Sequence, residues 1–168
     1  MRISTRINGK AVERDVEPRL LLSDFLRHHI GLTGTHIGCE HGACGACTIQ
    51  LDGQPVRACL LFAVQAHRHS IRTVEGLMVD GELHPLQQAF HEEHALQCGF
   101  CTPGLLMTLE PVLATAAELD DARIRELMAG SICRCTGYQN IVAAVRKAAG
   151  SAQDSTDTRH APDSKDEE

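Results

Sequence analysis

Eight cysteines dominate the chemistry available to this chain of 168 residues, and they fall into two groups. The first group has the spacing Cys39-x4-Cys44-x2-Cys47 inside a glycine-rich loop, with Cys59 further along the chain. This is the plant-type spacing for a [2Fe–2S] cluster, in which four thiolates converge on two irons. Glycines allow such a loop to bend back so that backbone N–H groups face the sulfur atoms. We therefore predict a [2Fe–2S] cluster on these four cysteines.

Other uses of the first group fit its pattern less well. Structural zinc sites usually take their thiolates from two separated short knuckles, not from three ligands in one loop. Disulfides need an oxidising compartment, whereas the sequence starts on a strand pattern without an apolar signal-peptide segment, so we expect a cytoplasmic protein. His36 and His41 flank the loop, and either could be a Rieske-type ligand. Because four cysteines already fill the positions, loop or interface roles are preferred for both histidines.

The second group consists of two short motifs, Cys98-Gly-Phe-Cys101 and Cys133-Arg-Cys135. By spacing alone these motifs are compatible with zinc, with redox dithiol chemistry or with iron. A thioredoxin-like dithiol would need a βαβ context, and the surrounding pattern is helical. Each motif stands just before a predicted helix start, where the helix N-terminus favours an anionic thiolate. A second [2Fe–2S] cluster is favoured, with zinc as the alternative.

The elements that must position the first group read as strands around one short helix. Residues 3–7 alternate apolar and polar side chains, and Asn8-Gly9 predicts a two-residue hairpin turn. A second hairpin is expected at Asp52-Gly53. The predicted elements are strands at 3–7, 12–16, 48–51, 56–61 and 71–74 and a helix at 20–27. Together they predict a compact α+β domain over residues 1–77, with Cys59 on a strand.

The elements around the second group read as helices, which predicts an all-α domain over residues 82–150. Each cysteine motif lies between two of these helices. Pro111 falls within one of them and should kink or divide it. The predicted helices cover residues 85–96, a segment from Thr102-Pro103 to Leu113, a segment from Asp120 or Asp121 to Met128, and residues 138–149.

Composition excludes several classes of function. Acidic residues outnumber basic ones 22 to 16, which argues against binding to nucleic acid or to an anionic membrane. Residues 151–168 hold six acids against two bases and few apolar side chains, so we predict a disordered acidic tail. Neither a phosphate-binding loop nor a dinucleotide fingerprint is found, so FAD or NAD binding within this chain is disfavoured.

Three segments resemble the small iron–sulfur subunit of the xanthine oxidase-type molybdenum hydroxylases. They are Gly38-Cys-Glu-His-Gly-Ala-Cys-Gly-Ala-Cys47, Gln97-Cys-Gly-Phe-Cys-Thr-Pro-Gly104 and Cys133-Arg-Cys-Thr-Gly-Tyr138. The chain is similar to the small subunits of carbon monoxide dehydrogenase and of quinoline and isoquinoline oxidoreductases. The resemblance runs from about Ile3 to Ala148 and puts all eight cysteines on ligand positions.

The resemblance implies a fold and a set of partners. The fold would be a β-grasp, plant-ferredoxin-like domain followed by a four-helix-bundle [2Fe–2S] domain. The first cluster would lie nearer FAD on a medium subunit, and the second beside a molybdopterin-type molybdenum cofactor on a large subunit, in a dimer of heterotrimers. Gln97 and Cys135 would approach the pterin. The chain itself would be a non-catalytic subunit that passes electrons singly during hydroxylation of a substrate by the complex.

Several readings stay open at this level. A stand-alone two-cluster ferredoxin and a zinc-stabilised interaction module are the alternatives to an electron-transfer subunit. For the substrate of the complex, an N-heteroaromatic compound such as quinoline is the best guess, with carbon monoxide, an aldehyde, a purine or an aromatic acyl-CoA as alternatives. Arg134 is either merely exposed or offsets cluster charge. Tyr138, the only tyrosine, is expected to pack against its helix, with a role between redox centres as the alternative.

Overall fold

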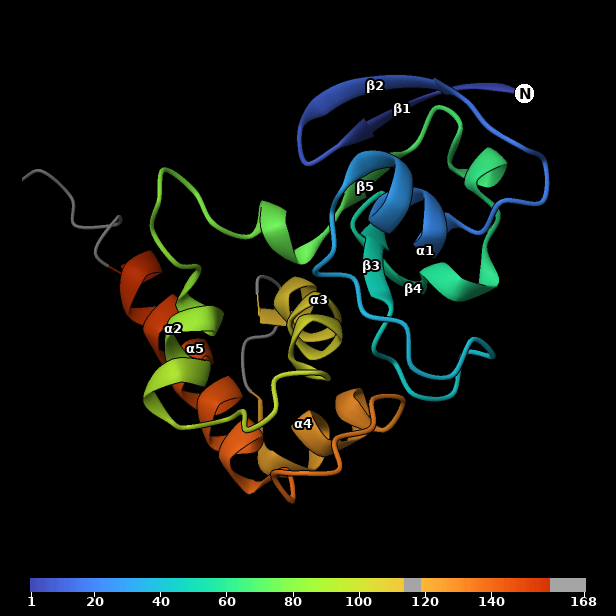
Figure 1. Cartoon of the computed structure of the whole chain (residues 1–168). Coiled ribbons are helices and arrows are strands. Elements are labelled where there is room, and N and C mark those ends of the chain that lie inside the picture. The colour runs from blue at the N-terminus through green and yellow to red at the C-terminus, as the bar shows by residue number, and fades with distance from the viewer. Residues whose placement is uncertain (114–118, 158–168) are drawn as a thin grey trace, which may run out of the picture.

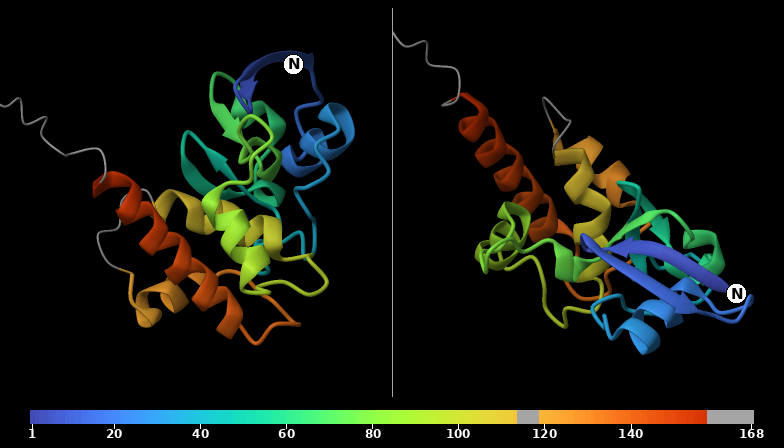
Figure 2. Two further views of the ribbon diagram at one scale, coloured as in Figure 1. Left: turned by 90° about the vertical axis from the view of Figure 1, so that its left-hand side faces the viewer. Right: turned by 90° about the horizontal axis from the view of Figure 1, so that it is seen from above.

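The computed structural model describes residues 1–113 and 119–157, with residues 151–157 given by their backbone alone. The N-terminal half forms a mixed five-stranded sheet with one short helical segment against it, and the C-terminal half forms four helices (Figure 1). Helix α3 lies between the sheet and the other helices (Figures 1 and 2). The predicted α+β fold, a β-grasp domain followed by a helical domain, is confirmed.

The sheet has the strand order β2-β1-β5-β3-β4. Strands β1 and β5 pair in parallel, and the three other neighbouring pairs are antiparallel. The predicted turn at Asn8-Gly9 joins β1 to β2, and both residues have positive φ as a two-residue hairpin turn requires. The strands are β1 (Arg2–Ile7), β2 (Lys10–Asp15), β3 (Thr48–Leu51), β4 (Gln54–Arg57) and β5 (Ser70–Arg72).

One helical segment packs on the sheet and fills its core. Helix α1 (Leu22–Asp24) continues as a π-helical turn over Phe25–Ile30, where the sequence predicts a single helix over residues 20–27. Leu22, Phe25 and Leu26 have no exposed surface, and they pack in one apolar cluster with alternate residues of β1 and β3. Burial of a Leu or Phe side chain contributes about 1.5–3 kcal/mol, so this helix stabilises the sheet that carries the first cysteine group.

Cys59 does not lie on a strand, which corrects the prediction of a strand over residues 56–61. Strand β4 ends at Arg57, and Ala58–Leu60 form a 3-10 turn. The Ala58 N–H still donates to the carbonyl oxygen of Cys47 at 3.2 Å, and the turn follows at once. Ending the strand here lets the Cys59 side chain interact with the Cys47 side chain across the hairpin.

Four helices form the second half, in the order that the sequence predicts. Asp120 caps α4, because its side chain accepts a hydrogen bond from the Arg123 N–H at 2.7 Å. His84 and Gln87 form a capping box at the start of α2. Helix α3 continues through Pro111, so the proline does not divide it within the described residues. The helices are α2 (Pro85–Glu92), α3 (Thr102–Leu113), α4 (Asp121–Met128) and α5 (Gln139–Asp157).

The end of α5 differs from the expected boundary. The sequence predicts a helix to residue 149 and a tail from residue 151, whereas α5 extends to Asp157. Residues 158–168, the rest of the predicted tail, lie outside the described residues. Among the described helices, none combines the length and the apolar character of a membrane span.

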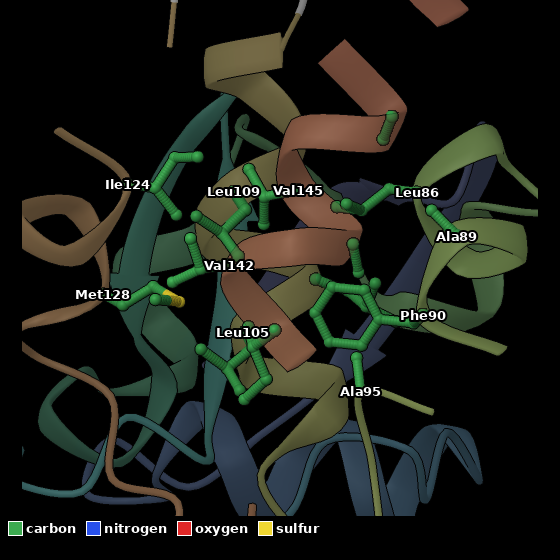
Figure 3. Close-up of a cluster of buried hydrophobic side chains, with 14 of the residues drawn as sticks. Leu86, Ala89, Phe90, Ala95, Leu105, Leu109, Ile124, Met128, Val142 and Val145 are labelled. Carbon is green, nitrogen blue, oxygen red and sulfur yellow. The ribbon is translucent and has the colours of Figure 1, made fainter. Parts of the chain in front are cut away.

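The four helices enclose an apolar cluster of their own, separate from that of the sheet. Leu86 and Phe90 from α2, Leu105 and Leu109 from α3, and Val145 from α5 meet at its centre (Figure 3). Cys101 and Cys133 belong to the edge of this cluster. The helical core thus holds the two loops of the second cysteine group in place.

Candidate metal centres

The first cysteine group forms two sulfur pairs. The side chains of Cys39 and Cys44 interact with each other, and so do those of Cys47 and Cys59. The Cys44 backbone N–H also donates to the Cys39 Sγ at 3.4 Å. Cys39 and Cys44 come from the glycine-rich loop and are half-buried. Cys47 and Cys59 come from the adjacent ends of β3 and β4 and are buried. The loop and the hairpin therefore bring the four predicted ligands together as two pairs, and the pairs are near enough for Cys44 to act on the charge of Cys47.

Two opposite effects act on these thiols. The backbone N–H groups of His41 and Cys44 donate toward the Cys39 sulfur and lower the pKa of this thiol to about 6. Burial raises the pKa of Cys47 to about 11, and the side chain of Cys59 adds to that effect. Amides directed at sulfur stabilise thiolate charge, while a buried thiol needs a cation to become a thiolate. The glycine-rich loop thus provides backbone hydrogen-bond donors to sulfur, and the β3–β4 hairpin provides the two buried thiols.

The second group also forms two pairs, and each pair joins the two motifs. The Sγ atoms of Cys98 and Cys135 lie 3.5 Å apart, and both residues are exposed. Cys101 and Cys133 interact through their side chains and are buried. One pair thus faces the surface and the other faces the helical core. Exposed Gln97 stands next to the outer pair, beside Cys98.

Local hydrogen bonds act on both pairs of the second group. The Phe100 amide and then the Cys135 side chain lower the pKa of Cys98, and the same contact with Cys98 raises the pKa of Cys135. Burial raises the pKa of Cys101 to about 12. At Cys133 burial acts in the same direction, but the hydroxyl and amide of Thr136 and the Cys135 amide outweigh it and lower its pKa.

The grouping by twos fits a two-iron cluster. A [2Fe–2S] cluster needs two thiolates on each of two irons, and each cysteine group supplies two pairs. A single zinc ion would need all four thiolates around one point, at about 2.3 Å from it. The donor chemistry and the pairing both suit two clusters, one for each group.

The loops of the two groups are in direct contact. The Ile132 N–H donates to the carbonyl oxygen of Cys44 at 2.8 Å. The His36 ring stacks on Phe100 at 4.8 Å between ring centroids, and its Nδ1 is 2.8 Å from the Phe100 carbonyl oxygen. His36 therefore has an interface position between the loops, and the His41 Nδ1 lies against the Cys39 carbonyl oxygen at 2.5 Å.

Backbone packing brings these loops close together. A Cβ atom placed on Gly104, in the first turn of α3, would lie 2.2 Å from the carbonyl oxygen of Gly45. A Cβ atom on Gly45 would lie 2.6 Å from the carbonyl oxygen of Gly130, and Gly45 also has a φ of +79°. Glycine is therefore required at both positions for the loops of the two groups to touch.

Two hydrogen-bonding contacts of the second group were not predicted from the sequence. The Tyr138 hydroxyl accepts a hydrogen bond from the Cys133 N–H at 2.7 Å and donates to the Ser131 carbonyl oxygen at 3.1 Å. The Thr136 hydroxyl lies 3.1 Å from the Cys133 Sγ. Tyr138 thus braces a cysteine loop as well as its helix. Arg134 is exposed.

Comparisons with known proteins agree with this geometry. Residues 5–70 match a family model described as a 2Fe-2S iron-sulfur cluster binding domain, and residues 73–146 match one described as a [2Fe-2S] binding domain. The chain is 64% identical over 147 residues to caffeine dehydrogenase subunit gamma of Pseudomonas sp. (strain CBB1), covering 86% of this chain and 88% of that protein. It is 50% identical over 148 residues to the nicotine 6-hydroxylase small subunit of Paenarthrobacter nicotinovorans, covering 88% and 89%.

Solved structures show the same arrangement of elements. A chain in the crystal structure of quinoline 2-oxidoreductase from Pseudomonas putida 86 matches with a TM-score of 0.88 and 51% identity, over 92% of this chain and 96% of that chain. The aldehyde oxidoreductase from Desulfovibrio gigas matches with a TM-score of 0.86 and 39% identity, over 92% of this chain and 17% of that chain. The likeness therefore extends across both halves of the molecule.

Proposed function

Because this chain belongs to the small [2Fe–2S] subunits of the xanthine oxidase-type molybdenum hydroxylases, we propose that it carries electrons singly from a molybdopterin centre on a large subunit to FAD on a medium subunit. The chain is the non-catalytic iron–sulfur part of an oxidoreductase. The observation that carries the proposal is the arrangement of eight thiols as four pairs, two in each cysteine group, with loops of the two groups in direct contact.

The proposed ligands are the eight cysteines, four for each cluster. When bound, a [2Fe–2S] cluster accepts and releases one electron at a time. The chain holds each cluster with thiolates, directs amides of the Cys39–Cys44 segment and of Phe100 and Thr136 at the sulfurs, and excludes water from the inner pairs. The proposed ligands are Cys39, Cys44, Cys47 and Cys59 for the first cluster and Cys98, Cys101, Cys133 and Cys135 for the second.

We further propose that the large subunit approaches the exposed pair of the second group. Of the eight cysteines only Cys98 and Cys135 are exposed, and Gln97 is exposed beside them. Gln97 and Cys135 would contact the pterin there. The two separate apolar cores support the proposed division into a ferredoxin-like domain over residues 1–77 and a helical domain over residues 82–150, but Leu77 at the end of the first packs in the helical core.

Exposed apolar side chains beside both cysteine groups favour an obligate subunit over a free carrier. Leu60 and Phe62 follow Cys59 and have 57% and 45% of their surface exposed. Phe100 and Ile132 adjoin the second group with 46% and 56% exposed. Apolar surface next to a functional site usually marks contact with another protein. A carrier without partners would leave these side chains in water.

The names of similar proteins support a nitrogen heterocycle as the substrate of the complex. Caffeine, nicotine and quinoline appear in these names, and all three contain nitrogen heterocycles. We therefore propose an N-heteroaromatic substrate, with an aldehyde as the alternative that the Desulfovibrio match suggests. A purified complex that oxidises aldehydes but none of the heterocycles would overturn this choice.

The experiment that tests the proposal is purification of the complex from its native cells. We expect this chain to co-elute with two larger chains, with four irons and four sulfides per copy and two distinct paramagnetic signals after reduction with dithionite. Elution as a free 18.3 kDa chain would overturn the subunit role. A colourless protein that contains zinc would overturn both clusters.

A further inference from the structure

A largely buried carboxylate near the C-terminal end of α3 joins this helix to the sheet. Glu110 has only 14% of its side chain exposed. Its Oε2 accepts a hydrogen bond from the Gln50 side-chain amide at 2.8 Å, and its Oε1 accepts one from the Arg72 guanidinium at 2.7 Å. Gln50 on β3 and Arg72 on β5 are directly opposed in the sheet. One carboxylate therefore spans two neighbouring strands.

Two of the three elements joined at Glu110, α3 and β3, begin directly after cysteines of the two groups. Strand β3 starts at Thr48, directly after Cys47, and α3 starts at Thr102, directly after Cys101. The Gln50 amide also lies 3.3 Å from the Met107 carbonyl oxygen, so β3 contacts α3 at two points. A shift of α3 along or away from β3 would move one cysteine group relative to the other.

We propose that Glu110 is a positioning residue, which sets the spacing of the two clusters by fixing α3 against β3 and β5. This inference rests on the proposed function, since it assumes two clusters. An ion pair of this kind contributes little net stability, because desolvation offsets its Coulomb attraction, but it specifies one arrangement. At the other end of the contact, the backbones of Gly45 and Gly104 touch without side chains between them, and such packing alone allows sliding. Glu110 adds a charged, directional contact on β3 and β5 beyond the Gln50–Met107 hydrogen bond, and it opposes such sliding.

The test uses the complete complex with Glu110→Ala and Glu110→Gln in this chain. The magnetic interaction between two reduced clusters falls with the cube of their separation, so we expect Glu110→Ala to weaken and broaden the splitting in the paramagnetic resonance spectrum. We also expect severalfold slower electron transfer between the clusters, with each cluster's potential unchanged. Glu110→Gln retains an acceptor oxygen and should fall between Ala and wild type. Glu126→Ala is the matched control, because Glu126 on α4 pairs with Arg123 at the exposed surface.

Two outcomes separate the possible failures. If Glu110→Ala keeps the wild-type splitting and rate, Glu110 has no positioning role, whatever the variant's melting temperature. If the wild-type complex lacks either cluster signal, the proposed function itself fails. If Glu110→Ala does not bind iron, the Glu110→Gln variant is used for the test. A wild-type splitting and a wild-type transfer rate in Glu110→Gln would then overturn the inference.

Discussion

The backbone N–H of Ile132 donates to the carbonyl oxygen of Cys44 across 2.8 Å. Cys44 is a proposed ligand of the first cluster, and Ile132 directly precedes Cys133, a proposed ligand of the second. This hydrogen bond therefore joins the two cysteine loops without any side chain between them. The close approach of these loops therefore depends on the packing of the residues around them.

Substitution of Gly104 by alanine should separate the loops. The added Cβ would meet the Gly45 carbonyl oxygen at 2.2 Å, and backbone cannot rotate away as a side chain can. We expect a loss of about 1–3 kcal/mol in the free energy of unfolding, as for overpacked sites, together with loss of iron. Urea denaturation and iron analysis measure both effects.

Gly150→Ala is the matched control for this substitution. Gly150 is also helical, but its added Cβ would meet no atom within 4 Å. Alanine is favoured over glycine in a helix by about 1 kcal/mol, so this variant should be slightly more stable than wild type. Equal stability of the two variants would contradict the close approach at Gly104.

Removal of one ligand from each group should remove one cluster at a time. We expect Cys59→Ala to lose the first paramagnetic signal and Cys135→Ala to lose the second, with about half of the iron retained in each case, because each cluster needs four thiolates of its own group. Iron analysis and paramagnetic resonance of the reduced complex report this directly. Loss of both signals from either variant would argue against independent sites.

Tyr138→Phe should disturb the second group alone. The lost hydroxyl leaves the Cys133 N–H without the acceptor at 2.7 Å, and an unpaired buried donor costs about 1–3 kcal/mol. We expect a shifted second paramagnetic signal and a lower melting temperature. The first signal, recorded in the same sample, serves as the internal control. A change in both signals would show that Tyr138 acts beyond its own loop.

His84 should make the protein less stable in acid. Burial lowers the pKa of His84 from 6.5, with Glu110 acting to raise it and Arg72 to lower it. In the unfolded chain this histidine binds a proton as the pH falls through about 6.5, whereas in the folded chain it does so only at lower pH. The free energy of unfolding should therefore decrease as the pH falls below about 6.5, and His84 should have no such effect above that pH. The His84 Nδ1 also accepts from the Leu86 N–H, which only the unprotonated nitrogen can do.

His84→Asn isolates this effect, because asparagine also caps helices but does not titrate. Unfolding free energies from urea denaturation at pH 8 and pH 5.5 should differ less for His84→Asn than for wild type. His91→Asn, at an exposed position of the same helix, is the control and should follow wild type. A parallel loss of stability in wild type and His84→Asn would contradict the assignment.

Local sequence signals predict the elements well. Asn8-Gly9 specifies its turn because both residues tolerate positive φ, and Asp120 specifies the start of α4 because its side chain caps the helix. The cysteine spacings predict which residues are ligands, whereas the pairing of Cys98 with Cys135 and of Cys101 with Cys133 depends on tertiary structure. The error at Cys59 arose where an apolar run continues past Arg57 while the chain turns to meet Cys47.

Contacts between distant segments could not be predicted. Glu110 is followed by a proline on a predicted helix, and nothing near it in sequence indicates Gln50 or Arg72 as partners. His36 and Phe100 are also far apart in sequence, and their stacking depends on how the two halves pack. Such contacts are set by tertiary structure, which leaves no periodic pattern in the chain.

The crossed pairing of the second group has a consequence for biogenesis. Each sulfur pair takes one member from the Cys98–Cys101 motif and one from the Cys133–Cys135 motif. Neither motif alone contains such a pair, so if these cysteines hold the proposed cluster, we expect it to be inserted only after α4 has brought the second motif back to the first. Once inserted, the proposed cluster would cross-link the starts of α3 and α5. Its loss by oxidation would remove this cross-link and destabilise that end of the helical domain.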